Sequence, residues 1–210
     1  MSFHGHIPLP EHGTFRGGIA RGANLRTPCG LRGIEMVRPG DLVVTRNGLQ
    51  PVRMVWTRCV TREQMQMSAD LAPIRLKPRA IGPMMPQRDL LLAPDHHLLV
   101  PGHRMAGMPD GIPVLTEARR LAGTCDSVHV DMSMDSVTFY HLVFDRQQIL
   151  AANGLPVASF LPDAVALRDL GGPMRDALED RFPALRERPD SYPAPEFGFA
   201  PDAEYLPYYA

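Results

Sequence analysis

Proline and glycine interrupt this chain so often that long helices cannot form through its middle. The 210 residues include 22 prolines and 18 glycines. Proline lacks the backbone N–H that a helix interior needs, and glycine favours turns. Between these breaks lie short segments in which apolar and polar residues alternate, a pattern that is typical of half-buried strands. The sequence therefore predicts a mostly β fold with many turns.

The predicted strands are short and are separated by turn residues. Asn47-Gly48 indicates a hairpin turn, because both residues tolerate positive φ. The clearest alternation runs over residues 50–60. A loop or loose helical turn is expected over residues 63–70. Further strand-like segments lie at residues 24–27, 31–37, 42–45, 73–77, 89–92, 128–132 and 137–144.

Composition changes after Phe160, where two short helices are predicted. Asp163 is a suitable N-cap for a helix over residues 164–170, and Pro173 suits the first position of a second helix that ends at Phe182. We therefore divide the chain into three parts. These are an irregular N-terminal arm over residues 1–17, a β domain over residues 18–162, and short helices with a Pro/Tyr-rich tail over residues 163–210.

Charge and targeting signals argue against several classes of function. The formal net charge is −1, so no strong field attracts nucleic acid or an anionic membrane. No apolar run approaches the roughly 20 residues that span a bilayer. The N-terminal residues lack the basic and apolar regions of a secretory signal peptide. We expect a cytoplasmic protein, or one exported by a route without such a signal.

Cysteine and histidine spacing predicts neither a disulfide framework nor a metal site. The three cysteines, Cys29, Cys59 and Cys125, form no CxxC pair, so a structural zinc site has no support. The histidines between the predicted strands match no metal-ligand spacing; they are His96, His97, His103, His129 and His141. No cofactor is expected from these patterns.

The segment Ala93-Pro94-Asp95-His96-His97 holds the strongest candidates for chemistry. His96 is a candidate for proton transfer, and the alternative is a histidine that is hydrogen-bonded inside a β core. Asp95 is suited to capping the turn after Pro94. Neighbouring strand residues point to opposite faces, so His97 is expected to face away from His96.

Three blocks of this sequence resemble the Hint (hedgehog/intein) domain, in particular a bacterial subgroup in which the domain lies near the C-terminus. The blocks run from Gly22 to Val43, from Leu92 to Leu99 and from Tyr140 to Phe160. The resemblance implies an all-β fold with pseudo-twofold halves and a short helical appendage. It also implies self-processing, in which an N-terminal Cys or Ser attacks its preceding carbonyl. A histidine then exchanges protons with the scissile nitrogen.

The family's site residues carry over only in part. His96 matches the histidine, but the nucleophile position falls at Gly18, and glycine has no side chain with which to attack. Ala93 stands where a threonine helps to hold the scissile peptide. After Asn153-Gly154, the chain lacks the terminal His-Asn pair of inteins. The resemblance therefore implies a degenerate active site.

Three functions stay open at this point. The first is a Hint-domain protein that no longer cleaves itself and acts as a scaffold or interaction module with protein partners. The second is an active self-cleaving domain with a displaced nucleophile and His96 as the proton donor. Cys29 is the nearest thiol to the empty nucleophile position, and Asp95 neighbours the proton donor. The third is a β module that binds a small molecule or a metal in the cleft around His96.

Overall fold

The structure, a computed structural model, is mostly β and describes residues 17–200 and 203–207. The arm predicted over residues 1–17 lies outside the described residues except for Gly17. The described strands are β1 (Ile19–Ala20), β2 (Asn24–Thr27), β3 (Gly30–Gly33), β4 (Leu42–Thr45), β5 (Gly48–Pro51), β6 (Met54–Thr61), β7 (Ile74–Leu76), β8 (Leu90–Leu92), β9 (His97–Val100), β10 (Val114–Glu117), β11 (Val128–Val130), β12 (Ser136–Val143), β13 (Ile149–Ala152) and β14 (Leu155–Ala158). The α-helices are α1 (Arg62–Met67), α2 (Ala164–Asp169), α3 (Gly172–Arg181) and α4 (Ala184–Glu187).

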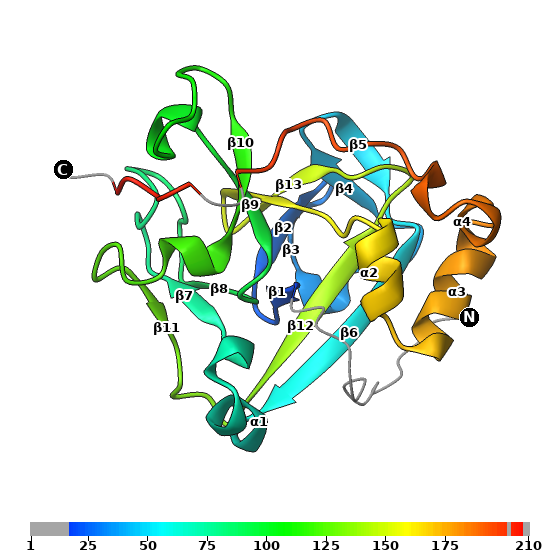
Figure 1. Cartoon of the computed structure of the whole chain (residues 1–210), viewed down its shortest axis with the longest axis horizontal. Coiled ribbons are helices and arrows are strands. Elements are labelled where there is room, and N and C mark those ends of the chain that lie inside the picture. Colours follow the sequence, from blue (N-terminus) through cyan, green and yellow to red (C-terminus); the bar gives the residue numbers. More distant parts are fainter. Residues whose placement is uncertain (1–16, 201–202, 208–210) are drawn as a thin grey trace.

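The first of two antiparallel sheets has the strand order β11-β7-β8-β1-β12-β6 (Figure 1). The short strand β1 lies between β8 and β12, where Ile19 pairs with both Leu92 and Tyr140. The long strands β12 and β6 pair along their whole length, from Ser136 opposite Thr61 to Val143 opposite Met54. The start of β1 is therefore held between two strands that are far from it in sequence.

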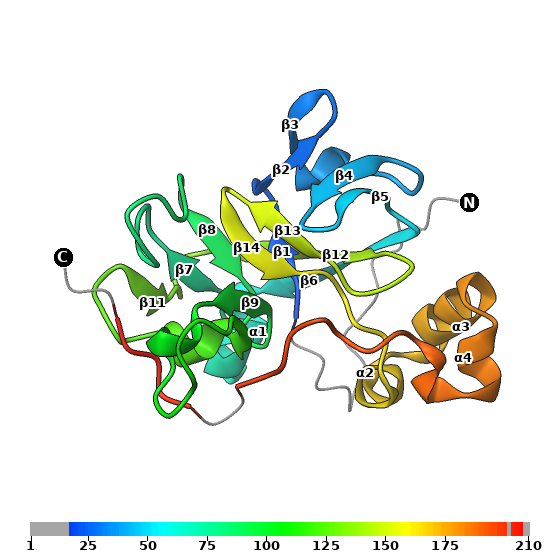
Figure 2. The same cartoon turned by 90° about the horizontal axis from the view of Figure 1, so that it is seen from above.

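The second sheet has the order β10-β9-β14-β13-β2-β3; β4 joins it through β13, and β5 pairs with β4. Its hairpins β2–β3 and β4–β5 project from one side of the molecule, away from helices α2–α4 (Figure 2). The largest apolar cluster draws on both sheets and includes Leu25, Leu92, Leu98 and Leu142. Burial of this cluster is the main favourable term that holds the two sheets together.

Several local predictions are confirmed, and others change where tertiary contacts intervene. The predicted hairpin is the β4–β5 turn, although only Gly48 of the Asn-Gly pair has positive φ, at 83°. The segment 31–37 is a strand only to Gly33, and a 3-10 helix over Ile34–Met36 then buries Ile34. The loose turn at 63–70 contains α1, whose N-terminus has a capping box between Thr61 and Gln64. Such boxes satisfy free N–H groups at a helix start.

The predicted C-terminal helices are present and belong to the same folded body. The Asp163 carboxylate accepts a hydrogen bond from the Ala166 N–H at 2.8 Å, as expected for the N-cap of α2. Leu167 of α2 and Leu178 of α3 pack against Trp56 of β6 in a second apolar cluster. Figure 1 shows these helices beside β6 and β12. No helix within residues 17–200 or 203–207 is long and apolar enough to cross a membrane.

The packing of α3 predicts a large cost for shortening Leu178. Its side chain is fully buried, so Leu178→Ala should lower the free energy of unfolding by about 2–5 kcal/mol in urea denaturation. Val165→Ala is the matched control, because Val165 of α2 is 55% exposed and should cost less than about 1 kcal/mol. Equal costs would contradict the integration of the helices into the core.

Candidate functional site

The peptide bond between Gly17 and Gly18 is held at both ends by buried side chains. The Gly18 N–H donates a hydrogen bond to His96 Nδ1 at 3.2 Å. The Gly17 carbonyl oxygen accepts one from Arg58 Nη2 at 3.3 Å. The position occupied by Gly18 therefore meets the predicted proton-transfer histidine, and a guanidinium polarises the carbonyl of the same peptide bond.

Gly18 has a backbone conformation and surroundings that favour glycine. Its backbone φ is +123°, a value that L-residues with a side chain rarely adopt. A Cβ added there would lie 2.7 Å from Phe139 Cβ and 2.9 Å from His141 Nε2. The Gly18 carbonyl oxygen accepts a hydrogen bond from the Ala93 N–H at 2.9 Å. Ala93, which stands where the family resemblance expects a threonine, thus contacts Gly18 through its backbone.

His96 is a neutral imidazole with a defined tautomer. Burial, with a smaller contribution from His97, lowers the pKa of His96 to about 3. Because Nδ1 accepts the Gly18 N–H, the ring proton of the neutral form lies on Nε2. That Nε2 has no hydrogen-bond partner among the described residues. The site therefore contains a buried N–H donor that no acceptor in residues 17–200 or 203–207 satisfies.

A second histidine, His141 of β12, flanks Gly18 on the other side. Its ring stacks on Trp56, with centroids 3.7 Å apart, and Phe160 lies edge-on to it. Burial first, and then the charge of Arg58, hold the pKa of His141 well below its usual range. The stack fixes the orientation of the ring, and burial keeps it neutral.

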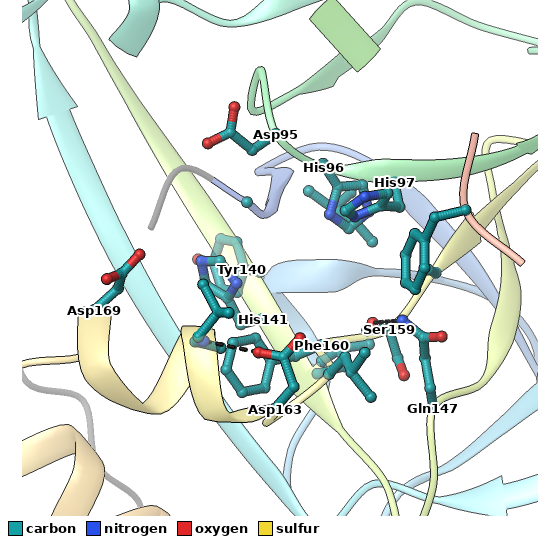
Figure 3. A pocket seen from close by; sticks show the side chains of 18 of the residues that line it. Asp95, His96, His97, Tyr140, His141, Gln147, Ser159, Phe160, Asp163 and Asp169 are labelled. Carbon is teal, nitrogen blue, oxygen red and sulfur yellow. Dashed lines mark hydrogen bonds between the residues drawn. The ribbon is translucent and has the colours of Figure 1, made fainter. Parts of the chain in front are cut away.

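These groups line a cavity of about 470 Å³ (Figure 3). His97 also lines it, so the prediction that His97 faces away from His96 is wrong. The physical reason is that His96 lies in the turn before β9 and only His97 is in the strand, so strand alternation does not apply to the pair. His97 is packed against Phe199 of the C-terminal segment, with ring centroids 4.8 Å apart.

The structure places the other two predicted site residues, Asp95 and Cys29, in different surroundings. Asp95 lines the cavity, and its Oδ1 lies 3.0 Å from Arg119 Nη1 in an ion pair. Cys29 is exposed in the turn between β2 and β3 and does not line the cavity. Its backbone N–H donates to the hydroxyl of Thr27 within the same hairpin. The structure therefore brings Asp95 and His96 together but leaves Cys29 outside.

Two polar residues of the site were not singled out from the sequence. Arg58 is 5% exposed and follows Met54 and Trp56 on the buried face of β6. A charged residue that alternates onto the same strand face as buried apolar residues indicates a paired or functional group, because charged side chains are buried only with partners. Ser159 is also buried beside the cavity, and its Oγ accepts the Gln148 N–H at 2.9 Å. Its sequence context carries no comparable signal.

No group of three or more His, Cys, Asp or Glu side chains within the described ranges could hold a metal ion. All three cysteines are free thiols. The uncharged polar groups of this cavity include the imidazoles of His96 and His141 and the hydroxyl of Ser159. Such groups are suited to hydrogen bonding with carbonyl oxygens and with amide nitrogens.

A family model described as a Hint domain matches residues 18–164. Because the match covers more than half of the chain, the protein belongs to the Hint-domain family, a family of self-processing type. The matched region begins at Gly18, the residue that faces His96 and His141. None of the curated proteins matches the sequence.

Solved structures of intein-like domains are similar in fold. The solution structure of a bacterial intein-like domain from Clostridium thermocellum has 15% sequence identity and a TM-score of 0.44, and the match covers 70% of this chain and all of that one. The gp41-1 intein has 11% identity and a TM-score of 0.38, with 67% and 97% of the two chains covered. The MchDnaB-1 intein has 13% identity and a TM-score of 0.40, with 66% and 98% covered.

The close contacts of Gly18 predict that a side chain at this position is costly. Gly18→Ala combines a strained φ with contacts to Phe139 and His141. Gly22→Ala is the matched control, because Gly22 has φ +90° but open space around it. In urea denaturation we expect Gly22→Ala to cost about 1–2 kcal/mol from backbone strain. Gly18→Ala should cost about 1–3 kcal/mol more from overpacking. Equal losses would show that the site accommodates a side chain.

Burial of neutral His96 predicts a stability that falls in acid. Its pKa is about 3 in the folded state and about 6.5 in the unfolded state. Between these values only the unfolded chain binds the proton, so the free energy of unfolding decreases as pH falls from 6.5. His97 and His141, whose pKa values are also lowered, act in the same direction.

The test is the slope of the unfolding free energy between pH 5 and 6.5 in the wild-type chain and in His96→Gln. Removing this group should reduce the slope by up to about 1.4 kcal/mol per pH unit, the effect of one proton. Above pH 7.5 the two slopes should agree, which serves as the internal control. An unchanged slope in acid would mean that His96 is protonated in the folded state.

Proposed function

We propose that this protein is a Hint domain with a degenerate active site, which acts as a scaffold or interaction module instead of cleaving itself. The observation that carries the proposal is the glycine at position 18, whose N–H donates to His96 Nδ1. An acyl shift requires a sulfur or oxygen nucleophile to attack the preceding carbonyl carbon. Glycine supplies no such atom.

The groups around the peptide bond support this proposal rather than an active site. His96 and Arg58 contact the nitrogen and the carbonyl oxygen of the Gly17–Gly18 bond, so binding groups are present without a nucleophile. When catalytic residues act as a unit, loss of the nucleophile removes most of the rate enhancement. The space beside Gly18 is filled by Phe139 and His141, which favours a role in packing.

A role in protein interaction is supported by apolar side chains on the projecting hairpins. Leu31 of β3 is 64% exposed, and Leu42 of β4 and Leu49 of β5 are also exposed. These hairpins project from the sheets (Figure 2). Exposed apolar side chains on projecting hairpins are available for contact with a protein partner. We propose proteins, and not nucleic acid, as the partners.

The alternative is self-cleavage with a displaced nucleophile. The Ser159 hydroxyl favours testing it, because Ser159 lines the same cavity as Gly17 and His96. In that reaction the Ser159 Oγ would bond to the Gly17 carbonyl carbon to form an ester, and the bond to the Gly18 nitrogen would break. His96 would transfer the hydroxyl proton to the departing nitrogen. Water or hydroxylamine would then cleave the ester and release the N-terminal part. Cys29 fits this role less well, since it lies outside the cavity.

The deciding experiment is intact-mass analysis of the full chain with a reporter protein fused before Met1. We expect one uncleaved mass after a day at 37 °C, with or without dithiothreitol or hydroxylamine, because Gly18 supplies no nucleophile. A fragment that begins at Gly18 and disappears in His96→Ala would overturn the proposal. In that case Ser159→Ala and Cys29→Ser would identify the attacking residue.

A further inference from the structure

We propose that the cavity beside His96 binds a small uncharged molecule with an apolar body and a carbonyl oxygen, such as an amide, ester or lactone. The proposal deepens the proposed function, on which it rests in treating the cavity as a binding site that is not used for cleavage. Four features of the described residues support it: the construction of the cavity, its unsatisfied donor, its charges and its apolar walls.

The cavity is built by two parts of the chain that are distant in sequence. Its inner wall comes from the turn before β9 and from β12, which contribute His96 and His141. Its outer wall comes from Val165 of α2 and from Phe199. The volume of about 470 Å³ lies within the range of small-molecule sites, roughly 300–1,000 Å³. The C-terminal residues therefore shape the cavity that encloses the family's histidine.

Two neutral donors in this cavity lack an acceptor among the described residues. His96 is buried, and its protonated Nε2 has no hydrogen-bond partner there. The Ser159 Oγ accepts the Gln148 N–H, and the hydroxyl proton has no described acceptor. Buried donors are normally paired, so an unpaired one favours a ligand that brings an acceptor. A carbonyl oxygen has two lone pairs and no proton, which suits both donors.

The charged residues disfavour an anionic ligand. Asp95 and Asp163 line the cavity, and Arg119 is the cationic residue among its described lining residues. Arg119 lies between two carboxylates, with Asp95 at 3.0 Å and Glu117 at 2.8 Å. The imidazoles of His96 and His141 add no positive charge, because burial lowers their pKa values. A carboxylate or phosphate would enter a lining that contains three carboxylates, of Asp95, Asp163 and Asp169, and one guanidinium.

Apolar and aromatic side chains provide the surface for the body of the ligand. Leu142 lines the cavity, as does Phe160, whose ring lies edge-on to His141 (Figure 3). Phe199 also lines it and packs against His97. Small-molecule sites commonly combine such apolar walls with a few polar groups that set orientation. An apolar molecule with a single carbonyl group would match both kinds of lining.

The test uses two probes of nearly equal shape, phenylacetamide and phenylacetate, with the ¹⁵N-labelled full chain in NMR titrations. We expect phenylacetamide to shift the Gly18 amide signal with a Kd on the order of 1 mM, as suits a fragment. Phenylacetate should bind at least about tenfold more weakly, because it carries a charge that the carboxylates of the lining disfavour. Equal binding of the two probes, or no binding of phenylacetamide, would overturn the proposal.

Two variants of cavity residues and one control variant test the location of the binding site, and none of them changes His96. Val165→Trp places a large ring on the outer wall and should abolish binding of phenylacetamide. Val130→Trp is the matched control, because Val130 of β11 is exposed and does not line the cavity. Ser159→Ala should weaken binding about three- to tenfold through loss of one donor. Equal effects of the two tryptophan variants would contradict the location.

Intact mass measured after each titration separates this proposal from the previous one. Binding by an uncleaved chain supports both proposals. A cleaved chain that still binds phenylacetamide overturns only the loss of self-cleavage. An uncleaved chain that does not bind overturns only the ligand assignment.

Discussion

The insertion of β1 between β8 and β12 is the constraint on which the site depends. Ile19 pairs with Leu92 on one side and Tyr140 on the other, so the residue before it cannot move away from either strand. Without β1, two strands in the middle of a sheet would lose their backbone partners, and unpaired buried backbone groups are costly. Gly18 is therefore held against His96 and His141 by the same hydrogen bonds that close the sheet.

This placement explains why the groups of the site are fixed in position, and why they are neutral hydrogen-bonding groups with no side chain at position 18. Burial keeps His96 and His141 neutral, and Arg58 donates a hydrogen bond to the Gly17 carbonyl oxygen. The same burial leaves no room for a side chain at Gly18. His96 and Ser159 are left as donors in a cavity that helix α2 and Phe199 also line. This lining supports the binding role that we propose for the cavity.

Local sequence signals predicted the elements better than the site. The hairpin at Gly48 and the N-cap at Asp163 follow from side-chain and backbone preferences of a few neighbouring residues, and both are present. His96 was found because a histidine beside an aspartate and a proline turn stands out. The position of His97 was mistaken, because a turn shifts the phase of the strand that follows it. Ser159 gave no local signal at all.

The sequence by itself determined the strand and turn segments, the capped C-terminal helices, the family resemblance and the glycine at position 18. These properties depend on residue type and on spacing along the chain. Only the tertiary structure decided that Gly18, Arg58 and His96 meet at one peptide bond, that Cys29 stays outside, and that Phe199 completes the cavity. The reason is that periodicity specifies which face of a strand is buried, whereas pairing between distant strands specifies which buried faces meet.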